Sequence, residues 1–447
     1  MRIAAVAGAA LLLSAPAGLR AQKGADMRCT YEGEHQENHK TASGQYDVYI
    51  GGNAIARCPA KKIIIKADSI EQHVDEKRVY LLGHVYYEEP TYNVHSDYLT
   101  YYQTDDRVVA VGNVDARMAN GSTLQGPNAI YLRKTTARPR SHLTATQRPT
   151  VSIVDKDSTG KPVPPVKVTA NTLVMDGDSL VFGSGLVQMV RDDFTGTCDS
   201  VFMDGTKETV HMMRNPVITG QKGRPFTLTG IAIDLFSRQR KLRRVVSKGK
   251  GNAVSQDLTL TADTINLVVN DDVLERSEAW GPKRATAKSP TQSLLADSID
   301  VIMPQQRVRE IRAVRKARAE AKPDTVKFRT NELDWLTART IVAYFDTMPP
   351  KDTSQAPRIR RLIGRDSAAS YYNFAPSDSS CHIPAINYAT GDTITVNFGD
   401  HGVDSVKVIG QRDGVMLQPC AASDSSKSKP KKPPVPAPSM PYERPRE

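Results

Sequence analysis

Three short patterns in the chain combine residue types that could do chemistry. The first is GDSL, residues 177–180, which matches the nucleophile motif of lipase-like hydrolases with Ser179 as the nucleophile. Such a hydrolase also needs a histidine three residues after an aspartate, and none of the nine histidines has that spacing. GDSL also falls where a polar turn is expected. We therefore interpret it as a turn and expect no catalytic residue there.

The other two patterns could hold a metal or a pair of acids. In HQENH, residues 35–39, His35 and His39 are four residues apart, as in a zinc-protease helix, but the glutamate is misplaced and no third ligand is evident. The clusters TDD (104–106) and NDD (270–272) could supply a general acid and base. Turn propensity explains such Asp and Asn clusters more simply. We expect no metal, no cofactor and no enzymatic activity.

Five cysteines could form disulfides if the chain folds in an oxidising compartment. A Cys29–Cys58 bond would close an amino-terminal loop, and a Cys381–Cys420 bond would close the carboxy-terminal segment. Cys198 lies in a strand-like run and would stay free. The C-x2-C spacing of thiolate zinc sites does not occur in the sequence. These two pairs are possible disulfides, and the connectivity stays open.

Both ends of the chain differ in composition from the rest. Residues 1–21 begin with Arg2, continue in an apolar run and end in small residues before Ala21, which is typical of a cleavable signal peptide. The run is shorter than the roughly 20 residues that a spanning helix needs. We therefore expect export to the periplasm. Residues 421–447 are rich in Pro and Lys, which predicts a disordered basic tail.

Between these ends the chain repeats one phrase of a small or polar residue, a turn-favouring residue and then an aliphatic residue. It is written KADSI at 66, HSDYL at 95 and TADTI at 261, and its nine aliphatic positions are 70, 99, 130, 173, 201, 233, 265, 299 and 341. The repeat length is about 31 residues, with two longer units. In the third unit, the Pro and Gly residues of 138–165 predict a loop excursion.

Each repeat unit reads as a β-hairpin. Aliphatic residues recur at every second position, as in Ile265, Leu267 and Val269, and a polar turn separates this run from a second apolar run. Two strands of about 10 to 12 residues at ~3.3 Å per residue would each span roughly 35 Å. One short helix is expected, in VREIRAVRKARAEA at 308–321.

Hairpins in series form an antiparallel meander, and strand twist must curl a sheet of this many strands. The glycines after the second run, Gly83, Gly112, Gly183 and Gly281, together with the Asp or Asn of the phrase, predict bends at fixed positions. The same aliphatic position of each unit should then face a common interior. These interior residues are Ile70, Leu99, Leu173, Val201, Ile233, Ile265 and Ile299.

The A-D-x-I or A-D-x-L start and the G-x-V end of the units, as in KADSI…GHV and HSDYL…GNV, resemble the OstA/LptA-like family of lipopolysaccharide-transport periplasmic proteins. The similarity covers roughly 44–345, and 384–419 looks like the closing hairpins of long OstA-like proteins. The resemblance implies an all-β fold, a long antiparallel repeat meander folded over as an open β-jellyroll. It would comprise jellyroll repeats over 22–345 and a C-terminal β-hairpin segment over 346–420.

The same resemblance implies a function. The chain would be a periplasmic lipopolysaccharide-binding transport or bridge protein whose seven interior residues shield lipid A acyl chains during transfer to the outer membrane. Its partners would be lipopolysaccharide, other Lpt-type jellyroll domains stacked by their edge strands, and the outer-membrane assembly machinery at the inner face of that membrane. Two alternatives stay open: a secreted β-repeat structural or adhesive protein with a dry interior, and a polysaccharide-acting β-solenoid enzyme, which would need clustered carboxylates in neighbouring coils.

The chain is basic, with a formal net charge of +11. Cations concentrate in 235–251, in 307–322 and in the tail. Such a charge favours anionic partners, and export argues against nucleic acid as one of them. The cations either meet phosphorylated lipid or cover solvated strand faces and loops.

Overall fold

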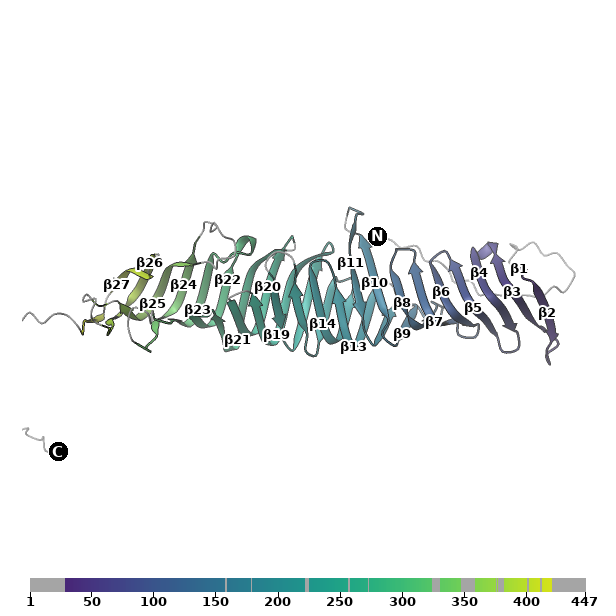
Figure 1. Ribbon diagram of the computed structural model, residues 1–447, viewed down its shortest axis with the longest axis horizontal. Helices are drawn as coiled ribbons and strands as arrows, with labels where there is room; N and C mark the ends of the chain where they lie inside the picture. Colours follow the sequence, from purple (N-terminus) through teal and green to yellow (C-terminus); the bar gives the residue numbers. More distant parts are fainter. Residues whose placement is uncertain are drawn as a thin grey trace, which may run out of the picture.

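The computed structural model describes residues 29–156, 159–177, 179–221, 225–255, 258–271, 273–323, 330–346, 358–374, 376, 382–399, 402–410 and 412–419. These residues form 28 β-strands in one antiparallel sheet and contain no α-helix, which confirms the predicted all-β meander. The strands follow one another along a single axis and form a long rod (Figure 1). The predicted signal peptide and basic tail lie outside the described residues.

The strands and two short 3-10 turns follow in chain order. They are β1 (Thr30–Glu32), β2 (His35–Lys40), β3 (Tyr46–Cys58), η1 (Pro59–Lys61), β4 (Ile63–His73), β5 (Arg78–Glu89), β6 (Tyr92–Tyr102), β7 (Arg107–Met118), β8 (Thr123–Leu132), β9 (His142–Thr146), β10 (Thr150–Lys156), β11 (Pro162–Thr169), β12 (Thr172–Asp176), β13 (Leu180–Val190), β14 (Phe194–Asp204), β15 (Thr209–Met213), β16 (Val217–Gly220), β17 (Phe226–Thr229), β18 (Ala232–Arg238), β19 (Lys241–Ser255), β20 (Leu258–Asn270), β21 (Val273–Lys288), β22 (Gln292–Ile302), η2 (Pro304–Gln306), β23 (Glu310–Ala321), β24 (Asp334–Phe345), β25 (Ile359–Phe374), β26 (Ala385–Gly399), β27 (Gly402–Ile409) and β28 (Asp413–Leu417).

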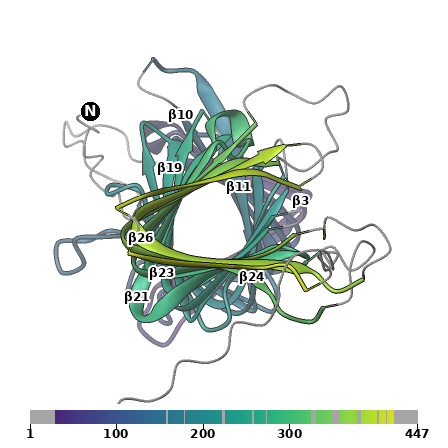
Figure 2. The same cartoon turned by 90° about the vertical axis from the view of Figure 1, so that its left-hand side faces the viewer.

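The long strands bend in the middle and so belong to two layers. The register between β4 and β5 breaks at the middle of both strands, and the same break recurs along the rod. Elsewhere the strand is split at that point: β9 pairs with 128–132 of β8, and β10 pairs with 123–125 of the same strand. Seen along the rod, the strands form two facing layers (Figure 2).

We name the parts of this roll by their place on each bent strand. The corner is the line of bends that joins the two layers. The first layer holds the half-strands such as 69–73 of β4 and 78–82 of β5, and the second layer holds halves such as 63–66 and 85–88. The mouth is the side opposite the corner, where both layers end in turns. The strand pairings within the described ranges all run inside one layer, and none joins the layers across the mouth.

The repeated phrase is the sequence of the corner. Asp68, at the bend of β4, lies over Gly83 at the bend of β5, where a Cβ would be only 2.0 Å from the Asp68 Oδ2 atom. Gly83 has a φ of +73°, which residues with side chains rarely adopt. The neighbouring His84 donates from Nδ1 to Asp68 Oδ2 at 2.9 Å. Asp97 and Gly112 repeat this arrangement one unit later, with a corresponding Cβ distance of 2.2 Å.

The backbone at the corner usually turns through two consecutive left-handed residues. Glycine opens five of these pairs: Gly52–Asn53, Gly83–His84, Gly112–Asn113, Gly185–Leu186 and Gly249–Lys250. Four pairs contain no glycine: Gln147–Arg148, Arg214–Asn215, Arg315–Lys316 and Asp366–Ser367. The turn is therefore imposed by the roll as a whole, since it forms even where the local residues disfavour it.

The predicted corner position was wrong for one of the four glycines, Gly183. Gly83, Gly112 and Gly281 lie at bends with positive φ, but the bend of β13 is at Gly185, two residues after Gly183. Gly183 instead sits in the ladder beside Val201, whose Cγ1 atom would be 2.9 Å from a Cβ at this position. It is small because a large neighbour fills its space.

Two local predictions also failed. The helix expected over 308–321 is β23, because Ile311 and Ala313 alternate inward between β22 and β24. The loop expected over 138–165 forms β9, β10 and the start of β11, because Val151 continues the period-two pattern and Pro149 falls at the corner. Within the predicted C-terminal segment 346–420, strands β25 to β28 continue the same roll, since β25 pairs directly with β24 and β26 with β25.

The corner geometry predicts that Gly83→Ala destabilises the amino-terminal units. The left-handed backbone costs an alanine about 1–2 kcal/mol, and the contact with Asp68 adds to this. Amide hydrogen exchange in β4 and β5 should accelerate accordingly. Gly51→Ala is the matched control, because a Cβ there meets nothing within 4 Å and its φ is ordinary. Equal exchange rates in both variants would contradict this account of the corner.

Candidate functional site

The seven interior residues predicted from the repeat all lie in the core, and each side chain is at most 2 % exposed. They occupy equivalent positions just inside the first layer, so they follow one another along the rod. The ninth phrase places Ile341 in the same row, and a tenth phrase that the sequence analysis missed, TGDTI at 390–394, places Ile394 there. Their burial is a finding, and their contact with lipid stays a prediction.

The remaining aliphatic position of the phrase, Ile130, breaks the pattern. It is 38 % exposed, and the inward residue of β8 is Ala129, opposite Ala110. A shift of one residue in a strand sends each side chain to the other face. In the sequence Asn128 takes the place of the Asp in GPNAI, but the strand register puts Pro127 at the bend, and Ala129 thereby takes the inward place.

Large and small residues alternate along the interior row of the carboxy-terminal half. Neighbouring strands place opposite one another, in order, Ile265, Ala279, Ile299, Ala313, Ile341, Gly364 and Ile394. The space over each small residue is filled from elsewhere in the interior. A Cβ at Gly364, for example, would be 3.2 Å from the Leu336 Cδ atoms of the second layer.

Side chains fill the space between the layers. Met212 of the first layer reaches Gly196 of the second, where a Cβ would be 3.0 Å from its Cε atom. Leu173, Ile233 and Ile265 have no surface that water can touch. A slot wide enough for hydrocarbon would leave such a surface, so acyl chains could enter here only if the layers moved apart.

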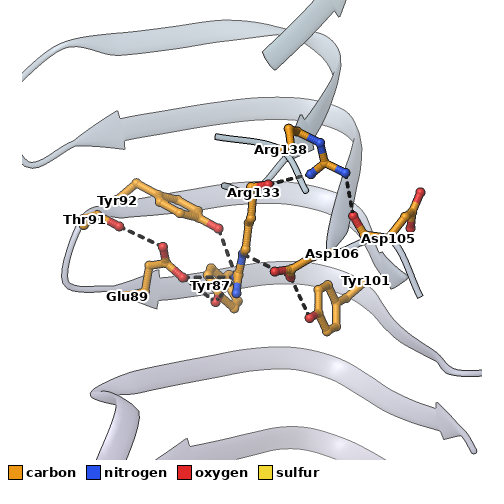
Figure 3. A network of polar contacts seen from close by, with 9 residues as sticks. All are labelled: Tyr87, Glu89, Thr91, Tyr92, Tyr101, Asp105, Asp106, Arg133 and Arg138. Atoms are coloured by element: carbon orange, nitrogen blue, oxygen red, sulfur yellow. Dashed lines mark hydrogen bonds and ion pairs between the residues drawn. The ribbon is translucent and has the colours of Figure 1, made fainter. Parts of the chain in front are cut away.

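A polar cluster crosses the mouth near the amino-terminal end of this interior (Figure 3). Arg133 follows β8 at the end of the first layer, and its Nη2 atom donates to the Tyr87 hydroxyl at 2.7 Å and to Glu89 Oε2 at 3.1 Å, both in the second layer. It also donates to the Tyr92 hydroxyl at 3.2 Å. Arg133 and Asp106 lie 4.0 Å apart at their closest charged atoms.

The cluster is buried, and its charges are matched. Burial alone would lower the pKa of Arg133, but Tyr92, Tyr87 and Glu89 outweigh it and hold the pKa above its usual value. Burial likewise raises the pKa of the Tyr87 hydroxyl. Glu89 accepts hydrogen bonds from Tyr87 and from Thr91, both at 2.8 Å. Arg133 therefore stays charged and fastens the two layers to each other.

The polar cluster also divides the interior. One apolar group extends from Ile50 to Val108, and the other continues to Val396. Tyr92 packs against both groups. Sequence reasoning missed Arg133; the available signal was an arginine directly after an apolar strand, in a part of the chain where tyrosines recur at strand ends.

A second charged contact crosses the mouth near the middle of the rod. Arg240, in the turn between β18 and β19 of the first layer, forms an ion pair with Asp155 of β10, with 2.9 Å between Nε and Oδ2. Its other contacts, with Glu208 and with the Gly205 carbonyl, stay within the first layer. Charged side chains thus hold the mouth together at places where no strand pairing does.

The described residues among those first considered for chemistry lie in separate turns and strands. Ser179 lies in a turn, where its carbonyl accepts a hydrogen bond from the Gly205 N–H. His35 and His39 lie on strand β2, where a separation of four residues spans roughly 13 Å. Asp105 pairs with Arg107 at 3.2 Å, and Asp271 pairs with Lys241 at the same distance. The described side chains nowhere gather three potential metal ligands.

The structure also places three of the five cysteines, and the edge strands lie at the two ends of the rod. Cys29 and Cys58 form a disulfide that ties the start of the described chain to the end of β3. Cys198 is buried and free, and burial raises the pKa of its thiol to about 11. Cys381 and Cys420 lie outside the described residues.

The edge strands are polar at β2 and apolar at β28, where Val415, Met416 and Leu417 are exposed.

Comparisons with known proteins add no assignment: no family model matches the chain, and no curated protein matches it. Within the described ranges, no helix has the length and apolar character needed to cross a membrane.

The geometry predicts that Arg133→Met destabilises the roll. The substitution keeps an apolar stem but leaves Glu89 and Asp106 without their cation, and losing one partner of a buried pair costs roughly 3 kcal/mol. Hydrogen exchange in β5 and β8 should report the loss. The control is Arg140→Gln, which removes an exposed cation 3.8 Å from Asp176 and should have almost no effect. Similar hydrogen-exchange rates in both variants would show that Arg133 does not hold the two layers together.

Proposed function

We propose that the chain is a periplasmic lipid carrier or bridge that holds the acyl chains of lipopolysaccharide between its two layers during transfer to the outer membrane. The observation that carries the proposal is the apolar interior, whose two groups together run from β3 to β26, bordered by a mouth that no pairing of the described strands closes. The resemblance of the repeated phrase to the OstA/LptA-like family supports the same function.

Energetics make such a carrier useful. Each methylene removed from water contributes about 0.8 kcal/mol, so a chain of about 14 carbons gains roughly 10 kcal/mol on burial. Because side chains fill the interior, the layers must part to admit the chain. The corner can act as the hinge, since it is the side on which each strand passes continuously from one layer to the other. The gain from burying hydrocarbon then offsets the side-chain contacts that are lost.

The exposed edges support a bridge built from several domains. Strand β28 presents apolar side chains and pairs with β26 alone among the described strands, and such an edge favours strand addition by another chain. A jellyroll domain of the same kind is the partner we propose there. Stacking would extend the apolar interior from one domain to the next and would deliver lipid to the outer-membrane assembly machinery.

A structural rod is the second candidate function. The observation that favours it is the complete burial of Leu173, Ile233 and Ile265, which is what a dry core requires. A structural rod would keep its layers closed and would bind no lipid. The two functions therefore differ in whether hydrocarbon reaches the interior.

Photo-crosslinking in cells that make lipopolysaccharide tests the proposal. Photoreactive residues at Leu173, Val201 and Ile265 should form lipopolysaccharide adducts, because these side chains face the interior. The matched controls are Val111 and Phe182, which are exposed. Circular dichroism of each purified variant checks that it is folded. If folded interior variants give no more lipopolysaccharide adducts than the control variants, the structural rod is favoured and the carrier function is contradicted.

Locking the mouth provides a second prediction. Cysteines at Asp155 and Arg240, joined by a short bis-maleimide, would tether the layers where their side chains already meet. Lipopolysaccharide adducts from the interior positions should then fall severalfold. The control lock joins Glu208 and Arg240, which meet within the first layer and leave the mouth free. Both locks are made in a background without Cys381 and Cys420. Undiminished adducts in the locked protein would exclude entry through the mouth.

A further inference from the structure

The corner of the carboxy-terminal half carries an unusual group of cations, which we call the basic corner. It consists of Lys283 and Arg284 of β21, Arg315 and Lys316 of β23, Arg339 of β24 and Arg365 of β25. All six side chains are exposed, and none forms an ion pair with a carboxylate of the described residues. Four acids lie at the same line of bends, Asp263, Asp297, Asp366 and Asp392, so the six cations outnumber them.

The basic corner is unfavourable for the fold in two ways. Arg315 and Lys316 have φ values of 64° and 48°, whereas Gly83, Gly112 and Gly249 open the same turn in other units. The cations also lie on nearby strands, which are spaced about 4.8 Å apart, so they repel one another. The strain recurs at other bends, but six cations without a carboxylate partner on nearby strands are particular to this corner. Their mutual repulsion lowers stability, which indicates a role other than stability.

A surface cavity lies within the basic corner. Its volume is about 330 Å³, and its lining includes Arg284, Lys316, Arg318, Thr337 and Ser367. Three cations and the Ser367 hydroxyl thus border one hollow, while the Thr337 hydroxyl donates to the Ala369 carbonyl at 3.4 Å. Such a set matches a phosphate group, whose oxygens accept several hydrogen bonds from arginine, lysine and hydroxyl donors.

Two of the lining arginines are held in place by the surrounding chain. Arg284 donates from Nη2 to the carbonyl of Lys316, which links the bends of β21 and β23. Arg318 pairs with Glu320 at 2.6 Å and lies over the Trp335 ring at 5.2 Å. Ordered cations lose less freedom when they bind an anion, so the cavity is preorganised.

We propose that this cavity binds a phosphate ester, in the form of a phosphomonoester or a diphosphate. The site lies at the corner, on the side opposite the mouth, so it is independent of whether the interior holds lipid. The same chemistry is present in a lipid headgroup and in a soluble phosphate. The experiment therefore separates these two sources.

Binding of inorganic pyrophosphate to the full chain, measured by calorimetry, tests the site. The variant Arg284→Gln/Lys316→Gln removes two lining cations and should weaken binding by roughly tenfold or more, because charge-assisted hydrogen bonds are lost. The matched control is Arg214→Gln/Lys250→Gln, which removes two exposed cations at left-handed bends of other units. The control should bind pyrophosphate as the unaltered protein does.

The outcomes of this experiment decide the proposal. Absence of pyrophosphate binding, or an equal loss in both variants, would overturn it, because the second result would mean diffuse attraction to a basic protein. Flotation with phosphatidylcholine vesicles, with and without phosphatidic acid, then identifies the source. Flotation that needs phosphatidic acid and is lost only in the cavity variant assigns the site to a headgroup. Pyrophosphate binding without flotation assigns it to a soluble phosphate.

Discussion

A β-strand can serve two facing layers only if it turns between them without leaving the sheet, and this turn governs the whole molecule. Here the turn is made by left-handed residues on one strand and by a short polar side chain on the next. Asp68 over Gly83 is the clearest case, because no side chain could replace that glycine without displacing the carboxylate. Since each bend pairs with the bends beside it, a misplaced bend would disrupt two neighbours. The bends therefore stay in line, and the roll grows into a rod.

The position of the corner determines what the other parts of the roll can do. It joins the layers along one side by continuous chain, so the opposite side is left to side chains. Arg133 and Arg240 hold the mouth by charged contacts, and such contacts can exchange for water when the layers part. Apolar contacts supply most of the attraction between the layers, because they run the length of the rod. A hinge on one side and exchangeable fasteners on the other permit opening without unfolding.

The sequence was most informative where local pattern and global fold agree. The repeat gave the hairpins, the corner and the seven interior residues, because a strand that buries one face must alternate, and a corner must use small or turn-favouring residues. The sequence was misleading at β8, where it predicted Ile130 as the inward residue but Ala129 faces inward. Both faces of that strand carry aliphatic residues, so the pattern did not show the shift of one residue at Pro127. It was silent on Arg133, whose role depends on Tyr87 and Glu89, more than forty residues away. Contacts across the mouth have no local signature.

The alternation of large and small residues along the interior row bears on how the layers separate. Ile265, Ala279 and Ile299 succeed one another, and side chains of the second layer fill the space over small residues, as Leu336 does over Gly364. Such packing is lost one unit at a time, because each unit contacts mainly the units beside it. A flexible hydrocarbon chain could then replace side-chain contacts stepwise, gaining about 0.8 kcal/mol for each methylene that it buries. If the interior holds acyl chains as proposed, contacts limited to neighbouring units would allow their progressive entry.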